Sequence, residues 1–105
     1  MRMWMVEPEF MCDRHLLGEH VEIHMLAGSI TRKKSIDGFL HGLVNPKLMK
    51  ARHEALAQEM TRRGMRHKSP IAAIDYCGAC GEISVQKNLR ELARRCPRCA
   101  ELIKK

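Results

Sequence analysis

Aromatic side chains are scarce in this chain of 105 residues, which has one tryptophan, one tyrosine and two phenylalanines. A core made of large rings is therefore excluded, and the eight methionines and the leucines must fill it. The length fits one domain, or one small domain with an appendage. Such a short chain buries only about 60–70% of the surface that it exposes when unfolded, so a metal or covalent crosslink would help it.

Long apolar runs are also lacking. No segment approaches the roughly 18 consecutive apolar residues of a membrane-spanning helix, and no signal-peptide pattern opens the sequence. Internal repeats and low-complexity tracts are absent too. We therefore expect a cytoplasmic protein with no membrane partner. In that compartment cysteines are metal ligands more often than they are disulfides.

Acidic residues are too few to balance the basic ones, with 12 Asp and Glu against 19 Lys and Arg. Residues 1–35 hold five of each kind, whereas residues 36–70 hold seven basic and three acidic, and residues 71–105 hold seven and four. The positive charge thus lies in the later two thirds of the chain. A small basic protein suits a polyanion, most often nucleic acid, although a solvated basic surface is the alternative.

A first helix is expected over about residues 14–27. Asp13 is suited to cap its start and Gly28 to end it. At about 100° per residue, one broad apolar side would carry Leu16, Leu17, Ile23 and Ala27. A separate polar stripe would carry His15, Glu19 and Glu22.

A second helix is marked more clearly by its ends. Asn45 is suited to the N-cap, Pro46 to the first helical position, and Gly64 follows the last turn. Arg62 and Arg63 lie in that last turn, where cations suit the helix dipole. We also expect these two arginines to contact DNA, because they belong to the basic part of the chain.

Two cysteine pairs predict a metal site. Cys77 and Cys80 are separated by two residues, as are Cys96 and Cys99, and 15 residues lie between the pairs. This spacing is typical of one structural zinc ion bound by four thiolates. A four-cysteine site has no open position, so it would be a structural crosslink without a catalytic role. Cys12 lies outside the pattern and is interpreted as a packed thiol.

The carboxyl-terminal third, about residues 71–105, is therefore predicted to be a zinc ribbon. The alternation of Ile83 and Val85 suggests a strand of that ribbon. Its basic residues could contact DNA or form a solvated face, and the sequence leaves both open.

The stretch HLLGEHVEIH, residues 15–24, admits three interpretations: a metal site, an acid–base site, or a polar helix face with partly buried histidines. His20 and His24 have the spacing of a metalloprotease helix. In that motif, however, glutamate directly follows the first histidine, and here Val21 does. Glu22 lies about 200° around the helix from His20 and cannot share its face. A catalytic metal here is therefore disfavoured.

A resemblance bears on the same stretch. MRMW at the start, DRHLLGEHVE on the first helix and KARHEALAQEMTRRGMRHKSP on the second resemble the pyrimidine-dimer DNA glycosylases of tailed phages and algal viruses. The similarity covers roughly residues 1–70. It lies in the position of Glu22, in Arg2 beside the first residue, and in a histidine seven residues before the glutamate.

The resemblance implies a function and site residues. In that family the N-terminal α-amine is the nucleophile and the glutamate assists it, without a metal or a small-molecule cofactor. The match assigns the amine to Met1 and the assisting carboxylate to Glu22. It assigns DNA contacts to Arg2, Arg14 and His15. The family's first residue is a threonine exposed by methionine removal, whereas the bulk of Arg2 should keep Met1 in place. The family's aromatic-rich tail is replaced by the cysteine-containing segment.

Together these observations predict a mainly α protein, with a helical glycosylase-like domain at residues 1–70 followed by a zinc ribbon at 71–105. The favoured function is a DNA-repair N-glycosylase with AP-lyase activity on double-stranded DNA with damaged or abasic sites, in a bacterial or phage-infected cell. The rival is a non-catalytic zinc protein that binds DNA or the transcription machinery. The sequence does not distinguish which lesion is the substrate.

Overall fold

The computed structural model describes residues 2–32, 34–36, 38, 44–65 and 83–104. They form four α-helices and short 3-10 turns without a strand among them, which confirms the predicted mainly α fold. The helices are α1 (Asp13–Thr31), α2 (Met49–Arg62), α3 (Val85–Arg95) and α4 (Pro97–Lys104). Short 3-10 helices precede α1 (η1, Pro8–Phe10) and α2 (η3, Pro46–Leu48). None of the described helices is long and apolar enough to cross a membrane.

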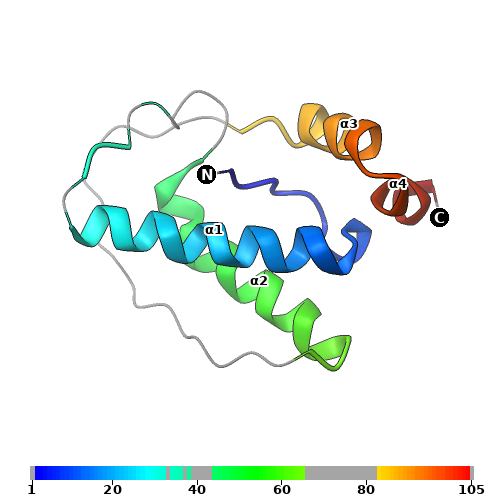
Figure 1. The fold of residues 1–105 in the computed structure, drawn as a ribbon, viewed down its shortest axis with the longest axis horizontal. Coiled ribbons are helices and arrows are strands. Elements are labelled where there is room, and N and C mark those ends of the chain that lie inside the picture. The colour runs from blue at the N-terminus through cyan, green and yellow to red at the C-terminus, as the bar shows by residue number, and fades with distance from the viewer. Residues whose placement is uncertain (1, 33, 37, 39–43, 66–82, 105) are drawn as a thin grey trace.

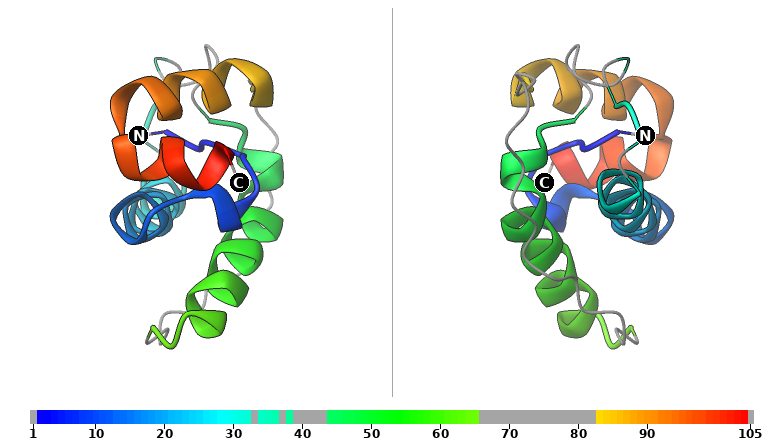
Figure 2. Two further views of the ribbon diagram at one scale, coloured as in Figure 1. Left: turned by 90° about the vertical axis from the view of Figure 1, so that its right-hand side faces the viewer. Right: turned by 90° about the vertical axis from the view of Figure 1, so that its left-hand side faces the viewer.

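The N-terminal segment, residues 2–7, runs alongside α1, with α2 crossing on the other side of that helix (Figure 1). Helix α4 packs against η1, so the C-terminal end lies beside the beginning of α1 (Figure 2). Elements far apart in the sequence therefore meet at one end of the molecule.

Helix α1 is longer than predicted. It begins at Asp13, with Cys12 in the capping position and no side-chain cap, and it continues past Gly28 to Thr31. The predicted end at Gly28 is wrong, and beyond it Ile30 is partly buried against the core. Leu17, expected on the apolar side, is 41% exposed.

The predicted end of the second helix is confirmed, but α2 itself begins at Met49, and Asn45 caps the 3-10 helix that precedes it. The side chain of Asn45 accepts a hydrogen bond from the Lys47 N–H at 3.2 Å, and a 3-10 turn leads into α2. Gly64 follows the helix with φ +79°, a left-handed conformation that glycine adopts without strain.

The core is built largely from methionine and leucine, as the composition requires. Its fully buried members include Met3, Met11, Leu16, Leu26, Met49, Leu56, Met60 and Leu92. Leu92 comes from α3 and Cys99 from α4, and both belong to the same cluster as the residues of the first two helices. The described C-terminal residues therefore share one core with the N-terminal part, while the predicted domain boundary near residue 70 lies outside the described residues.

The predicted strand is wrong at Val85, which is the first residue of α3. Ser84 caps this helix by accepting a hydrogen bond from the Lys87 N–H at 3.2 Å. Leu89 and Leu92 then recur at helical spacing on the side that packs against the core. The alternation of Ile83 and Val85 covers only two residues, whereas the Ser84 cap and the spacing of Leu89 and Leu92 both favour a helix.

Candidate functional site

A pocket of about 400 Å³ opens along the face of α1 that carries His15 and Glu22, and we call it the Glu22 pocket. Three separate parts of the chain line it, through Arg2, Trp4, Arg14, His15, Glu22 and Arg95. The fold thus brings together four residues predicted for the site, namely Arg2, Arg14, His15 and Glu22. The fifth, Met1, lies outside the described residues.

Glu22 holds the N-terminal segment at this pocket. The backbone N–H of Arg2 donates a hydrogen bond to Glu22 Oε2 at 3.1 Å. The Arg2 guanidinium lies over the Trp4 ring, 4.0 Å from its centroid, and donates to Asn88 Oδ1 at 2.8 Å. The Glu22 carboxylate and Arg2 of the N-terminal segment are therefore in direct contact.

Asn88 of α3 is a residue that the sequence analysis missed. Its amide nitrogen donates to the carbonyl of Trp4 at 2.8 Å and to that of Met3 at 3.4 Å. It is only 3% exposed, so these hydrogen bonds are shielded from water. Its position four residues before Leu92 would have predicted that it lies on the side of α3 that packs on the core.

Two glutamates of the predicted polar stripe, Glu19 and Glu22, have different partners in the structure. Glu19 is 1% exposed, and Arg52 of α2 binds its carboxylate through two hydrogen bonds of 2.5 and 2.8 Å. Arg52 also donates to the carbonyl of Val6 at 2.7 Å. Both glutamates line the pocket, but Glu19 is held in a buried ion pair, whereas Glu22 is half-buried and accepts the Arg2 N–H.

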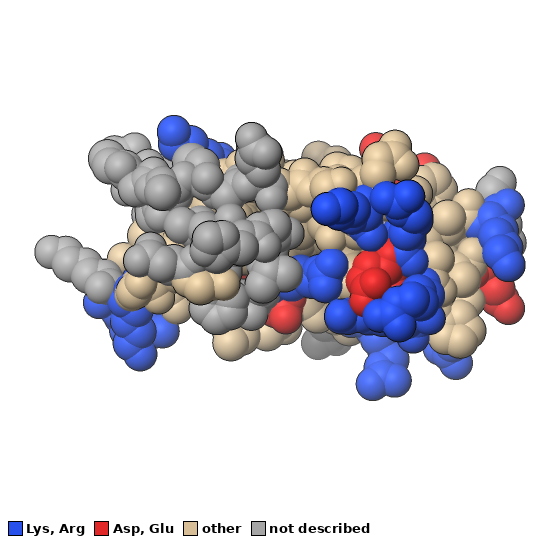
Figure 3. All heavy atoms as spheres, turned by 90° about the horizontal axis from the view of Figure 1, so that it is seen from above, with Lys and Arg blue, Asp and Glu red and all other residues tan. Residues whose placement is uncertain are grey.

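Three arginines, Arg2, Arg14 and Arg95, line the pocket, and Arg95 is paired with Glu91. Basic side chains gather around an acidic group over α3 (Figure 3), where Arg90, Arg94 and Arg95 are exposed. Burial lowers the pKa of His15, with the charges of Arg14 and Arg95 adding to the effect and Glu22 opposing it. The imidazole is therefore held in its neutral form more strongly than an exposed histidine would be.

The other two predicted DNA contacts, Arg62 and Arg63, lie at the end of α2. Arg63 is largely committed to internal bonds: it donates to Glu59, to Asp13 at 2.9 Å and to the carbonyl of Met11 at 2.7 Å. The side chain of Arg62 is 66% exposed and pairs with Glu59. DNA contact by these arginines stays a prediction.

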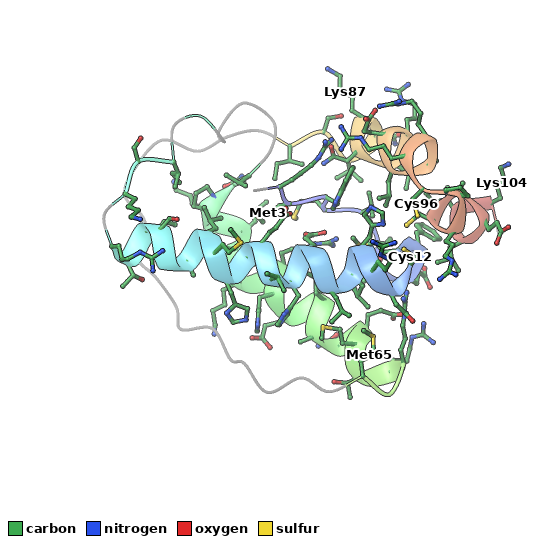
Figure 4. The ribbon with its side chains drawn as sticks, in the orientation of Figure 1. Met3, Cys12, Met65, Lys87, Cys96 and Lys104 are labelled. Atoms are coloured by element: carbon green, nitrogen blue, oxygen red, sulfur yellow. The ribbon has the colours of Figure 1, made fainter. Side chains whose placement is uncertain are left out.

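A second group of polar side chains adjoins the pocket and shares His15 with it. We call it the cysteine–histidine cluster, and its members are Cys12, His15, Cys96 and Cys99. Figure 4 shows Cys12 and Cys96 close together, at the beginning of α1 and next to α4. The Sγ atoms of these two cysteines are 3.8 Å apart, too far for a disulfide.

The four side chains converge on one point. His15 Nδ1 lies 3.3 Å from Cys12 Sγ and 3.6 Å from Cys99 Sγ. All four potential ligand atoms are within 4.8 Å of one another, so the cluster can hold a metal ion. Cys12, expected to be a packed thiol, is buried but is also a member of this group. Of the four predicted zinc ligands, Cys96 and Cys99 are present here, and Cys77 and Cys80 lie outside the described residues.

The remaining histidines of the HLLGEHVEIH stretch lie elsewhere on α1. His20 and His24 pack with His53 of α2, with ring centroids 4.7–5.0 Å apart. Their nitrogens also lie within 4.8 Å of one another. His20 and His53 are buried, as expected for histidines that pack between helices. No sequence spacing pointed to His53, which only the crossing of the two helices brings there.

Comparison with known proteins gives a family match. A sequence profile described as pyrimidine dimer DNA glycosylase matches residues 1–73, which include α1, α2 and the N-terminal segment. No curated protein and no solved structure matches the chain. The family implies DNA as the substrate. Since the profile covers more than half of the chain, the chain belongs to the pyrimidine dimer DNA glycosylase family.

Proposed function

We propose that this protein is a DNA-repair N-glycosylase with AP-lyase activity that uses the α-amine of Met1 as its nucleophile. The observation that carries the proposal is the 3.1 Å hydrogen bond from the Arg2 backbone N–H to Glu22. The proposed substrate is double-stranded DNA with a pyrimidine dimer or an abasic site, in the cytoplasm of a bacterial or phage-infected cell. The proposal takes Met1 as the first residue of the mature chain.

The proposed amine belongs to the residue that is bonded to Arg2, whose own backbone nitrogen lies 3.1 Å from Glu22 Oε2. An α-amine has an ordinary pKa of about 7.7–8.0, so a useful fraction is neutral near pH 7. The positive charges of Arg2, Arg14 and Arg95 around the pocket favour the neutral amine, and the negative charge of Glu22 opposes them.

The reaction then uses groups that the pocket provides. The neutral amine attacks C1′ of the damaged nucleotide, the glycosidic bond breaks, and the base leaves with the bonding electrons. Opening of the sugar gives an iminium between the amine and C1′, which acidifies the C2′ protons. Removal of one such proton expels the 3′ phosphate. Glu22 stabilises the cationic sugar and carries protons in these steps.

The other lining residues act on the DNA. Arg14 and Arg95 are placed to bind the phosphates that flank the opened nucleotide, since guanidinium groups match phosphate geometry. His15 adds a further contact at the junction of the pocket and the cysteine–histidine cluster. The side chain of Arg2 is held by Asn88 and Trp4, and this fixes the segment that carries the amine.

The proposed metal is one structural zinc ion. Thiolate and imidazole ligands are those that zinc prefers in proteins, and a site with four protein ligands has no open position for substrate. The ion would stabilise the fold next to the pocket and take no part in the chemical steps.

The alternative function is that of a non-catalytic zinc protein that binds DNA. It is favoured only by the basic surface and the metal-binding group, and these would be needed in both cases. It does not account for the arrangement of Arg2 and Glu22, which a binding module would not require.

Borohydride trapping on abasic-site DNA tests the proposal. Reduction of the iminium should join the protein covalently to the DNA, and mass spectrometry of the digested adduct should locate the link at Met1. Acetylating the α-amine, or adding an N-terminal tag, should abolish trapping because an amide nitrogen is not nucleophilic. Chelation with EDTA should not inhibit during the assay.

The matched control is the same protein on undamaged DNA, which should bind without forming an adduct. If the adduct is located at a lysine, the assignment of the amine is wrong. If no adduct forms while DNA still binds, the enzyme proposal fails and the binding module replaces it.

A further inference from the structure

We propose that the cysteine–histidine cluster is the zinc site of this protein, and that Cys77 and Cys80 are not its ligands. The ion would fasten α3 and α4, which lie outside the residues matched by the family profile, to the first turn of α1. This ligand set differs from the one that the cysteine spacing predicts. It joins segments about 80 residues apart in the sequence.

The spacing of the ligand atoms supports this set. Zinc bonds of about 2.3 Å to sulfur and about 2.0–2.1 Å to nitrogen, at tetrahedral angles, place two sulfurs about 3.8 Å apart and a sulfur about 3.5 Å from a nitrogen. The Sγ atoms of Cys12 and Cys96 are 3.8 Å apart. His15 Nδ1 lies 3.3 and 3.6 Å from the sulfurs of Cys12 and Cys99.

Backbone groups also suit thiolates at these positions. The N–H of Cys12 points to Cys99 Sγ at 3.2 Å, and the N–H of Cys99 points to Cys96 Sγ at 3.5 Å. Hydrogen bonds to sulfur favour the charged form of a thiol. At Cys99 burial outweighs them and raises the pKa of the thiol to about 12, so binding of the ion must release that proton. The ligand pairs Cys12–His15 and Cys96–Cys99 each have two residues between them, so each pair can bind one ion from a single turn.

The four positions of a tetrahedral zinc ion are filled by this cluster, which leaves none for Cys77 and Cys80. Coordination through Nδ1 also fixes the tautomer of His15, so that its Nε2–H is the donor available to the Glu22 pocket. Arg95, next to Cys96 in the sequence, lines the same pocket. The ion would thereby hold one wall of the DNA-binding site in place.

Cobalt(II) substitution in the full-length protein distinguishes the two ligand sets, because thiolate-to-cobalt charge-transfer absorption reports how many cysteines bind the ion. The wild-type protein should take up one equivalent, with a tetrahedral spectrum of three thiolates. Cys12→Ala should lose the absorption of one thiolate and weaken metal affinity at least about tenfold. The double variant Cys77→Ala/Cys80→Ala should keep the wild-type spectrum and affinity.

A variant that adds thiolate absorption cannot be explained by misfolding, which would only remove absorption. His15→Cys should retain the metal and add the absorption of a fourth thiolate, since Nδ1 lies near the position that a cysteine sulfur would take. An unchanged spectrum in His15→Cys, or loss of the metal in Cys77→Ala/Cys80→Ala, would overturn the proposal. A wild-type protein that binds no metal would overturn it too. None of these readouts depends on the lyase reaction, so failure of the zinc proposal can be distinguished from failure of the lyase proposal.

Discussion

Two glutamates on one helix have opposite environments although only two residues separate them. Glu19 is buried and bound by Arg52, whereas Glu22 is half-buried at the pocket and accepts the Arg2 N–H. Replacing each by glutamine changes little in shape but removes a negative charge. The pair therefore separates a loss of stability from a loss of chemistry.

Glu22→Gln should strongly reduce strand cleavage at abasic sites while leaving DNA binding nearly intact. The amide can still accept the Arg2 N–H, but it can neither carry a proton nor stabilise a cationic sugar. Loss of one such group typically costs about 10²–10⁴-fold in rate. Single-turnover cleavage and a binding titration measure the two effects.

Glu19→Gln provides the comparison. It leaves the buried charge of Arg52 without its carboxylate, which costs about 3–5 kcal/mol of unfolding free energy. The protein that remains folded should still cleave, as chemical denaturation and cleavage at low temperature would show. Normal stability in Glu19→Gln, or normal cleavage in Glu22→Gln, contradicts this division of functions.

At the scale of elements, α3 holds the N-terminal segment in position through the hydrogen bonds of Asn88. Asn88 binds the Arg2 side chain and the carbonyl of Trp4 from a position that is almost fully buried. The Arg2 N–H contact to Glu22 depends on the position of that segment. Helix α3 therefore acts on the site through the backbone of residues 2–4.

Asn88→Ala should lower both stability and the rate of borohydride trapping. It leaves the carbonyl of Trp4 buried without its donor, which costs about 1–3 kcal/mol, and it loosens the segment that carries the amine. Trapping should recover partly in Asn88→Asp, whose side chain can still accept from Arg2. Gln86→Ala, at an exposed position of the same helix, should change neither quantity.

The end of α2 gives a pH dependence of stability. The hydrogen bond from Arg62, with burial opposing it and Arg63 assisting, lowers the pKa of Glu59 to about 2. Because the folded pKa lies below the unfolded value of about 4.3, the stabilisation is complete above that value. It is lost as the pH falls towards 2.

Glu59→Gln should therefore be less stable than the wild-type protein at pH 7, by an amount on the order of 1–2 kcal/mol after allowing for the solvent around Arg62. The difference should shrink at pH 3, and urea denaturation at both values measures it. Glu101→Gln, exposed on α4, serves as the control. A difference that does not vary with pH would mean that the charge of Glu59 has no part in it.

At the scale of the whole molecule, basic side chains from α1, α3 and α4 meet on one side of the Glu22 pocket. Arg14, Arg95 and Arg98 line a second hollow of about 640 Å³ next to it, together with Cys12, His15 and Cys96 of the cysteine–histidine cluster. Each phosphate neutralised on binding releases counterions, so the affinity for DNA should fall as salt is added.

Arg14→Gln and Arg98→Gln should each reduce the slope of log K against log salt by about 0.9 if each side chain neutralises one phosphate. Arg62→Gln extends the measurement to the end of α2. A reduced slope would place Arg62 in the interface, and an unchanged slope would make it a helix-end charge. Unchanged slopes for Arg14 and Arg98 would contradict the placement of DNA over this face.

Local signals determined much of this protein. Methionine and leucine had to form the core because larger side chains were missing, and Asn45 and Gly64 set the second helix because capping and positive φ depend on neighbouring residues. The position of Glu22 and the charge of Arg2 predicted the site that the proposed function uses, and the fold brings both to one pocket. These features need only short stretches of sequence.

Tertiary structure decided what depends on contacts between distant segments. The pairing of Glu19 with Arg52 and the bracing by Asn88 require helices to pack, which no periodicity describes. The spacing of cysteines suggested a partner pair for Cys96 and Cys99, but the fold places Cys12 and His15 beside them. A spacing limits which residues can meet, whereas only the packed chain fixes which of them do.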